Sequence, residues 1–241
     1  MRSRTLLLHG FLGRGADWDA VRAGLPDAWD VMAPDLPGHG AAVGLDAGAY
    51  TMDAAAARLV DALDGPADVV GYSMGGRLAL HLAVVRPESV RRLVLVSASP
   101  GLGTEAERAS RRAVDAQRAA EIADDLAGFV DRWYRTPLFA LPGRLRQRLT
   151  RDRVLHNDAA ELGRSLRGMG TGAQPSHWGA LGGIRAPALA VAGGRDDKFV
   201  RLAQQMAAAG PVETAVVPGA AHLVPAEAPA ALAHLLTDFL S

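Results

Sequence analysis

The sequence predicts an α/β protein whose mostly parallel sheet carries helices on both faces. Short apolar runs bounded by glycine, proline or aspartate recur along the chain, and stretches with helical spacing separate them. Strands that alternate with helices lie parallel in one sheet, because each helix returns the chain to the start of the next strand. With 241 residues, of which 49% are hydrophobic, the chain can fill the core of one large domain.

The apolar runs predict six strands, at residues 5–8, 31–33, 68–70, 93–97, 188–192 and 214–217. Helical spacing follows most of these runs, at residues 51–63, 75–85, 201–208 and 229–240. This order of elements is typical of a sheet built from repeated strand–helix units.

A long segment, residues 101–182, separates the fourth expected strand from the fifth. It has helical periodicity at residues 104–126, 145–149 and 159–169 and no strand pattern. Connections inside a compact domain are much shorter than this, and long ones commonly cover functional sites. We therefore expect a single domain in which residues 1–100 and 183–241 form the core and residues 101–182 form an inserted helical lid.

Composition excludes several classes of function. The 26 basic and 26 acidic residues cancel, so neither a nucleic acid nor a membrane surface is an expected partner. The absence of cysteine excludes disulfides, thiolate metal sites and a cysteine nucleophile. The apolar run Thr5–Leu8 is too short for a signal sequence or a membrane span, so we expect a cytoplasmic protein. The choice between a monomer and a homo-oligomer stays open.

The strongest chemical signal is the segment Gly71-Tyr72-Ser73-Met74-Gly75, which joins an expected strand to an expected helix. In a G-x-S-x-G turn the serine is held in a strained conformation with its hydroxyl exposed, and small residues are needed two positions before and after it. The helix that follows directs its N-terminal N–H groups towards charge that develops beside the serine. This context predicts a reactive serine rather than an idle turn residue.

A serine hydroxyl reacts well only when a neighbouring imidazole takes its proton. His222 follows the last expected strand and precedes the last expected helix, where that base should lie. The acid that orients the imidazole should follow the fifth strand, where Asp196 and Asp197 are adjacent. The spacing from the strand end favours Asp196 over Asp197.

Negative charge that forms on a substrate oxygen also needs hydrogen-bond donors. The backbone N–H groups of Phe11, after the first strand, and of Met74, after the serine, are expected to form this oxyanion hole. Together with the chain order Ser73, Asp196, His222, these positions predict the α/β-hydrolase fold.

Arginine placement indicates an anionic substrate. Arg77 lies four residues after Ser73, one turn into the helix beneath the expected site. A cation at this position suits an anionic substrate and does not suit a neutral ester. The alternative is that Arg77 is an ordinary surface residue of the helix. The inserted segment holds many further arginines, most of which we expect to be solvated or paired with the acidic residues around them.

These residues resemble one family within the fold, the 2-succinyl-6-hydroxy-2,4-cyclohexadiene-1-carboxylate synthases of menaquinone biosynthesis. The resemblance covers essentially the whole chain. It is carried by LHGFLG at residues 8–13, DLPGHG at 35–40, GYSMGGR at 71–77 and GRDDKF at 194–199. In the inserted segment it is carried by PGL at 100–102, Glu107-Arg108 with Arg111, Trp133-Tyr134, and LRGMGTGAQPSHW at 166–178. The histidine loop departs from the pattern, because Ala221 stands where most members of the fold have glycine.

The resemblance implies a lyase that eliminates pyruvate from 2-succinyl-5-enolpyruvyl-6-hydroxy-3-cyclohexene-1-carboxylate, a small tricarboxylate. The reaction begins when a proton next to the succinyl ketone is removed, and it requires no metal and no organic cofactor. By the same resemblance the substrate is bound by Tyr72, Arg77, Arg111, Trp133, Tyr134 and Arg153.

Two other readings share these residues. A carboxylesterase or a carbon–carbon bond hydrolase acting on an acidic substrate would use the same triad, with a water molecule and an acyl-enzyme added. A catalytically idle binding protein is a third possibility, and the intact serine, aspartate and histidine in the expected order argue against it.

Overall fold

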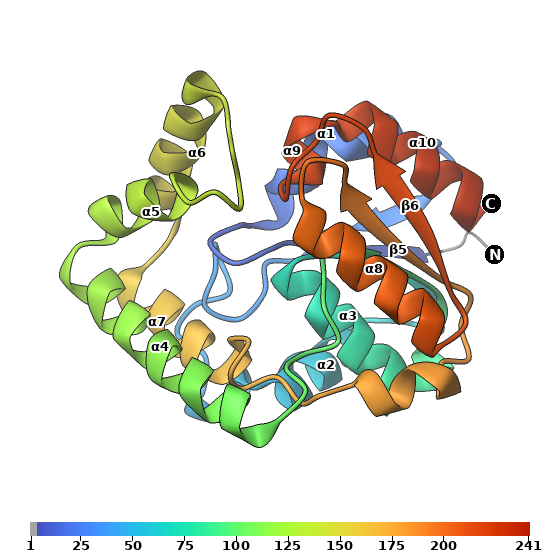
Figure 1. The fold of residues 1–241 in the computed structure, drawn as a ribbon, viewed down its shortest axis with the longest axis horizontal. Coiled ribbons are helices and arrows are strands. Elements are labelled where there is room, and N and C mark those ends of the chain that lie inside the picture. The colour runs from blue at the N-terminus through green and yellow to red at the C-terminus, as the bar shows by residue number, and fades with distance from the viewer. Residues whose placement is uncertain (1–3) are drawn as a thin grey trace.

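A computed structural model describes residues 4–241 and contains one sheet of six parallel strands in the order β2-β1-β3-β4-β5-β6 (Figure 1). The prediction of six strands in an α/β-hydrolase fold is confirmed. The strands are β1 (Arg4–Leu8), β2 (Asp30–Met32), β3 (Ala67–Tyr72), β4 (Val90–Val96), β5 (Ala188–Gly193) and β6 (Val212–Val217). Because all pairs are parallel, the loops that leave the carboxyl ends of the strands meet along one edge of the sheet.

Alternate residues of the central strands pack on opposite faces of the sheet. One face carries Leu7, Val70, Val94 and Val191. The other face carries Leu6, Val69, Leu93 and Ala190. Both sets are buried, which explains why these strands read as continuous apolar runs and not as an alternation of apolar and polar residues.

Helices cover both faces, as predicted. Apolar side chains of α1 (Asp19–Arg22), α9 (Val224–Glu227) and α10 (Pro229–Leu240) pack on the face that carries Leu7. Those of α2 (Met52–Asp61), α3 (Met74–Val85) and α8 (Asp197–Ala209) pack on the face that carries Leu6. Helix α8 begins four residues before the predicted start, because the Asp196 side chain caps it by accepting a hydrogen bond from the Phe199 N–H.

Residues 101–182, here called the inserted segment, contain four α-helices that lie together at the end of the molecule opposite the chain termini (Figure 1). They are α4 (Glu105–Asp124), α5 (Leu126–Tyr134), α6 (Gly143–His156) and α7 (Ala159–Met169). Thr104, Asp125 and Asp158 cap three of them with their side chains.

Two of these helices differ from the prediction. Helix α5 was not predicted, since only the capping residue Asp125 separates it from α4 and the periodicity continues across the break. Helix α6 is much longer than the predicted 145–149, because most of its sequence is arginine and other polar residues and gives no apolar stripe. Arginine is nevertheless a good helix former.

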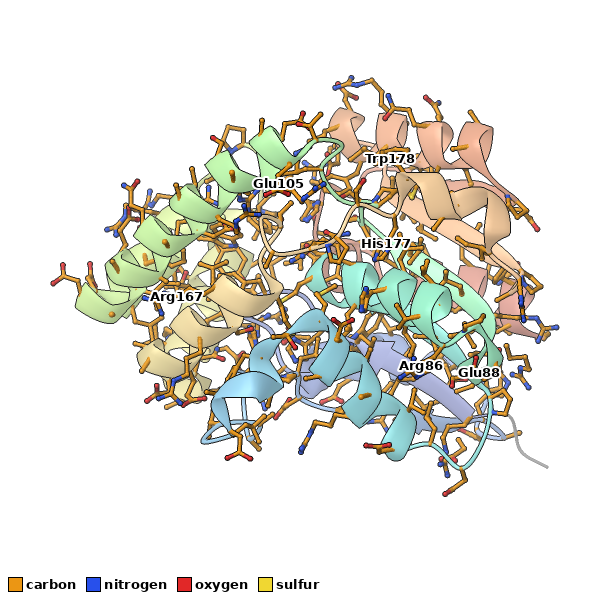
Figure 2. All side chains as sticks on the ribbon, turned by 90° about the horizontal axis from the view of Figure 1, so that it is seen from below. Arg86, Glu88, Glu105, Arg167, His177 and Trp178 are labelled. Atoms are coloured by element: carbon orange, nitrogen blue, oxygen red, sulfur yellow. The ribbon has the colours of Figure 1, made fainter. Side chains whose placement is uncertain are left out.

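Both ends of the inserted segment are tied to each other beside α3. The His177 N–H donates to the Pro100 carbonyl at 2.7 Å, and Trp178 Nε1 donates to the Gly101 carbonyl at 2.9 Å. Figure 2 shows His177 and Trp178 at this point, where the chain returns from α7 to the core. Within residues 4–241, no helix combines the length and the apolar character needed to cross a membrane.

Candidate active site

Ser73 lies in the sharp turn between β3 and α3, with φ 51° and ψ −107°. Its N–H donates to the Val96 carbonyl at 2.8 Å, which fixes the turn against the neighbouring strand. A Cβ added at Gly71 would collide with the backbone of Gly75, and one added at Gly75 would collide with the Leu8 carbonyl. The sequence therefore needs glycine on both sides of the serine for the chain to make this turn.

The structure brings Ser73, His222 and Asp196 into a hydrogen-bonded row. His222 Nε2 lies 3.3 Å from Ser73 Oγ, and His222 Nδ1 lies 2.8 Å from Asp196 Oδ2. The three residues follow β3, β6 and β5, so the parallel sheet gathers them at one edge. Of the two adjacent aspartates, Asp196 is buried against the imidazole and Asp197 is exposed on α8.

The loop that carries His222 is held by Glu227. One oxygen of this carboxylate accepts the Ala221 N–H at 3.1 Å, and the other accepts the Leu223 N–H at 3.2 Å. Arg195 Nη2 donates to the same carboxylate at 2.6 Å. Ala221 does not have a positive φ, so this position does not require glycine and alanine fits without strain.

The expected oxyanion donors lie beside the serine. A Cβ built on Gly10 would lie 3.5 Å from the Ser73 Cβ, so the turn that contains Phe11 passes directly beside Ser73. Met74 is the first residue of α3, and its N–H has no acceptor within the helix. Both residues line the cavity above Ser73.

His9 fixes this turn from behind. Its Nε2 accepts the Leu36 N–H at 2.9 Å, so its Nδ1 carries the proton and donates to the Gly10 carbonyl at 2.8 Å. Burial lowers the pKa of His9, which keeps the imidazole neutral, as this pair of hydrogen bonds requires. His9 is therefore a structural histidine that positions the Phe11 backbone.

A cavity of about 250 Å³ opens above Ser73 and His222, between the core and the inserted segment. Of the eleven residues predicted for the site, only Asp196 lies outside its wall, behind His222. The predicted residues that line it are Phe11, Tyr72, Ser73, Met74, Arg77, Arg111, Trp133, Tyr134, Arg153 and His222. Apolar side chains complete the wall, among them Leu102, Leu138, Phe139, Leu166 and Phe199.

Arg77 is buried in this wall, and not on the helix surface as the alternative reading had it. Its Nη1 donates to the Met169 carbonyl at 2.8 Å and to Gln174 Oε1 at 3.4 Å. Burial, with the nearby charge of Arg111 adding to it, lowers the pKa of Arg77 to about 10, so the group stays cationic at neutral pH. A buried cation of this kind stabilises an anion in the cavity.

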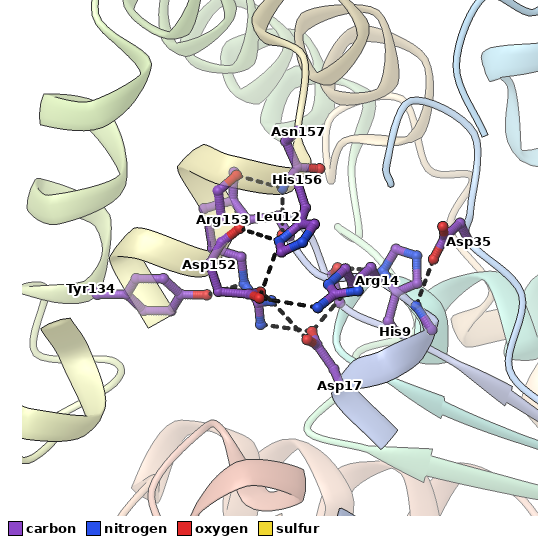
Figure 3. Close-up of polar contacts among 12 residues, drawn as sticks. His9, Leu12, Arg14, Asp17, Asp35, Tyr134, Asp152, Arg153, His156 and Asn157 are labelled. Carbon is purple, nitrogen blue, oxygen red and sulfur yellow. Dashed lines mark hydrogen bonds and ion pairs between the residues drawn. The ribbon is translucent and has the colours of Figure 1, made fainter. Parts of the chain in front are cut away.

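Arg111 and Arg153 approach the cavity from α4 and α6. Arg111 Nε donates to Asp115 at 2.8 Å. Arg153 is buried within a network of charged groups, in which both its terminal nitrogens donate to Asp17 and its Nε donates to the Tyr134 hydroxyl (Figure 3). Burial alone would lower the pKa of Arg153, but the contacts with Tyr134 and Asp17 outweigh burial and raise it.

Aromatic rings surround the imidazole and the mouth of the cavity. The Phe199 ring lies 4.5 Å from the His222 ring, centre to centre, and the Tyr72 and Phe139 rings each lie 5.6 Å from it. Trp133 stands edge-on to Phe11 at 5.7 Å. These rings exclude water from the imidazole, which strengthens electrostatic interactions inside the cavity.

Sequence reasoning missed two charged residues of the wall, Asp17 and Lys198. Lys198 had a signal, since it is the only lysine of the chain and follows Asp196 by two positions. Asp17 had none, because its partner Arg153 lies 136 residues away in the sequence. Within residues 4–241, no group of three or more histidine, aspartate or glutamate side chains is arranged to bind a metal ion. The absence of a metal or organic cofactor remains a prediction.

Comparison with known proteins agrees with this geometry. A model described as the alpha/beta hydrolase family matches residues 5–235. A protein of Bacillus subtilis (strain 168), provisionally named a 2-succinyl-6-hydroxy-2,4-cyclohexadiene-1-carboxylate synthase, is 36% identical over an alignment that covers 97% of this chain and 89% of that protein. The protein of that name from Enterobacter sp. (strain 638) is 33% identical over 98% of this chain and 90% of its own. The solved structure of MenH from S. aureus superposes with a TM-score of 0.93 at 31% identity, over 99% of this chain and 93% of that one.

Proposed function

Because this chain belongs to the 2-succinyl-6-hydroxy-2,4-cyclohexadiene-1-carboxylate synthase family of alpha/beta hydrolases, we propose that its cavity eliminates pyruvate from 2-succinyl-5-enolpyruvyl-6-hydroxy-3-cyclohexene-1-carboxylate. One observation carries this assignment. Ser73, whose Oγ lies 3.3 Å from His222 Nε2, lines a cavity whose wall also contains three arginines. A base beside several cations suits proton removal from a polyanion.

The reaction is a conjugate elimination. His222 Nε2 takes the proton of the Ser73 hydroxyl, and the serine oxygen takes the proton from the ring carbon that carries the succinyl ketone. The electron pair of that C–H bond forms an enolate. As the enolate collapses, the ring double bond shifts and the C–O bond to the enolpyruvyl group breaks. The released enolpyruvate takes up a proton and becomes pyruvate, while the ring is left with two conjugated double bonds.

The remaining core residues stabilise two charges that exist only during the reaction, on the enolate oxygen and on the protonated imidazole. The Phe11 and Met74 amides stabilise the enolate oxygen as it forms. Asp196 orients the His222 imidazole and stabilises its protonated form at 2.8 Å. No covalent bond between serine and substrate is needed, because the serine oxygen acts as a base.

The substrate's three carboxylates are the ligands that we assign to Arg77, Arg111 and Arg153. A planar guanidinium binds a carboxylate with two parallel hydrogen bonds, which lysine cannot do. Tyr72, Trp133 and Tyr134 also line the cavity, and in this proposal they pack against the six-membered ring of the substrate. In this proposal residues 101–182 act as the lid over a core of residues 1–100 and 183–241, and the protein works in the cytoplasm.

Pyruvate release from the enzymatically prepared cyclohexene substrate, coupled to lactate dehydrogenase, tests the proposal directly. A parallel assay with p-nitrophenyl acetate reports ester hydrolysis. Fast, Ser73-dependent pyruvate release with negligible ester cleavage supports the lyase. Pyruvate release no faster than the spontaneous background, together with rapid ester turnover and a burst, would identify a carboxylesterase or related hydrolase.

A further inference from the structure

Arg153 is already occupied by a carboxylate of the protein itself. Its Nη1 donates to Asp17 Oδ1 and its Nη2 donates to Asp17 Oδ2, both at 2.7 Å (Figure 3). Nη1 also donates to Asp152 Oδ2 at 2.7 Å, and Nε donates to the Tyr134 hydroxyl at 3.1 Å. A guanidinium has five N–H groups, so these four bonds leave Arg153 one N–H, on Nη2, for any other ligand.

The other two arginines of the wall differ in this respect. Arg77 uses Nη1 alone, and Arg111 forms its hydrogen bond through Nε. Among residues 4–241, Nη2 of neither side chain forms a hydrogen bond. Arg153 is therefore the one of these three cations whose two terminal nitrogens both donate to a carboxylate of the protein.

The charge around Arg153 is balanced as well. Arg14 Nη2 donates to Asp152 Oδ1 at 3.1 Å, so Arg14, Arg153, Asp17 and Asp152 form a group of two cations and two anions. A substrate carboxylate that approached Arg153 would find the carboxylates of Asp17 and Asp152 already bound to its guanidinium. Like charges so close together repel, and the new ligand gains a bidentate contact only if one of them leaves.

Of the two carboxylates on Arg153, Asp17 is the one placed to leave, because it lines the active-site cavity and its only other hydrogen bond among residues 4–241 is a long one, from the Arg14 N–H at 3.3 Å. It comes from a short helical turn of the core (Gly15–Trp18), and about a quarter of its side chain, 24%, is exposed. It lines both the active-site cavity and a second cavity between this turn and α6, where Arg14 and Arg148 are also found. A rotated Asp17 side chain would therefore still have cationic neighbours. Asp152 lines only the second cavity.

We propose that Asp17 is a resident counter-ion of the substrate site, which occupies Arg153 in the empty enzyme and is displaced by a carboxylate of the substrate. The exchange makes Asp17 a specificity-determining residue, because a ligand that cannot form the bidentate contact cannot displace it. The inference rests on the proposed function, since it takes the cavity to be the site of a polyanion. It also explains how a buried arginine avoids an unpaired charge before substrate arrives.

The variant Asp17→Asn tests this inference, because it keeps the shape of the side chain and removes the competing charge. We expect the KM for the cyclohexene substrate to fall about fivefold while kcat stays within about twofold. The dissociation constant of succinate, a simple dicarboxylate probe measured by calorimetry, should fall by a similar factor. If Asp17→Asn does not fold, Asp17→Ser removes the same charge and is measured in its place.

Asp152→Asn is the matched control, since it removes the same charge from the same guanidinium but from outside the active-site wall. Its KM and succinate affinity should stay within about twofold of the wild type. A higher KM in Asp17→Asn would show that Asp17 orients Arg153 for substrate and would overturn the proposal, as would equal changes in both variants. Wild-type protein that releases no pyruvate would contradict the proposed function instead, while the succinate measurement still decides the role of Asp17.

Discussion

The two walls of the cavity are built by different means. The core wall holds Ser73 and His222 on loops that leave the carboxyl ends of strands. The backbone of these loops is fixed by a strained φ at Ser73 and by two hydrogen bonds that the N–H groups on either side of His222 donate to Glu227. The wall from the inserted segment holds Arg111 and Arg153 on helices, and ion pairs between side chains fix these.

This difference separates chemistry from recognition. A group held by the backbone cannot exchange its partner without unfolding the turn that carries it. A group held by a side-chain ion pair can exchange one carboxylate for another at little structural cost, because the helix stays in place. We therefore expect changes at Ser73, His222 and Asp196 to act on the chemical step, and changes at the arginines of either wall to act on substrate binding.

The largest effect is expected from Ser73→Ala, which removes the reactive oxygen from the core wall. The rate of pyruvate release should fall about 10³–10⁴-fold, whereas KM should change little. Circular dichroism and the melting temperature should match the wild type, because the buried turn keeps its two glycines. Retention of more than about a tenth of the wild-type rate would contradict the assignment of Ser73 as the base.

Asp196→Asn should have the next largest effect, about 10²–10³-fold on kcat, because the imidazole loses the charge that orients it and stabilises its protonated form. Asp197→Asn is the matched control on the neighbouring, exposed position, and it should stay within about twofold of the wild type. Steady-state kinetics of the two variants decides between the aspartates. Equal losses would mean that charge near the site, and not the contact with His222, is what matters.

Arg77→Ala should lower kcat/KM about 10²-fold, mainly through KM, because a buried charge-assisted contact to the substrate is lost. Arg77→Lys keeps the charge and should recover part of the loss without restoring a bidentate contact. Arg77 also donates to the Met169 carbonyl, so the melting temperature of both variants separates substrate binding from support of α7. Unchanged kinetics in Arg77→Ala would remove the basis for an anionic subsite on the core wall.

The smallest effect concerns the free energy of unfolding. At the junction between the core and the inserted segment, His177 Nε2 lies 3.0 Å from His81 Nδ1. Burial lowers the pKa of His177 to about 4, and the neighbouring His81 adds to this shift. The unfolded chain, with an ordinary histidine pKa near 6.5, binds the proton first as pH falls, so His177 contributes stability above about pH 6.5 that is lost between pH 6.5 and 4.

Urea unfolding at pH 7 and pH 4.5 measures this contribution. The free energy of unfolding should fall by about 2 kcal/mol more in the wild type than in His177→Gln, which cannot take up the proton. Unfolding that depends on pH equally in both proteins would show that His177 is not the group that titrates. His39, whose pKa is also lowered well below its usual value by burial, is common to both proteins and cancels in this comparison.

Sequence reasoning predicted the core wall better than the other one, for a physical reason. The turn around Ser73 and the loop around His222 are set by residues adjacent in the chain, so a short pattern contains what determines them. Even there the start of α8 differs from the prediction: helical spacing begins at residue 201, whereas Asp196 caps a helix that begins at Asp197.

On the wall from the inserted segment, the spacing of residues in the sequence could not show which charged side chains form ion pairs. The resemblance to a known family predicted Arg111 and Arg153 as cavity residues, and both line it. It did not predict the ion pair between Arg153 and Asp17, because that pair forms only when α6 packs beside the helical turn Gly15–Trp18. Ion pairs between distant residues depend on packing that no local pattern encodes.

Glu227 has a consequence for anyone who redesigns this protein. Its carboxylate accepts hydrogen bonds from the backbone on both sides of His222 and from Arg195, which directly precedes Asp196. One side chain outside the cavity thus connects the loops that carry His222 and Asp196. Glu227 therefore holds the two loops in one arrangement. A design that moves Ser73, Asp196 and His222 onto another scaffold therefore has to carry Arg195 and Glu227 with them.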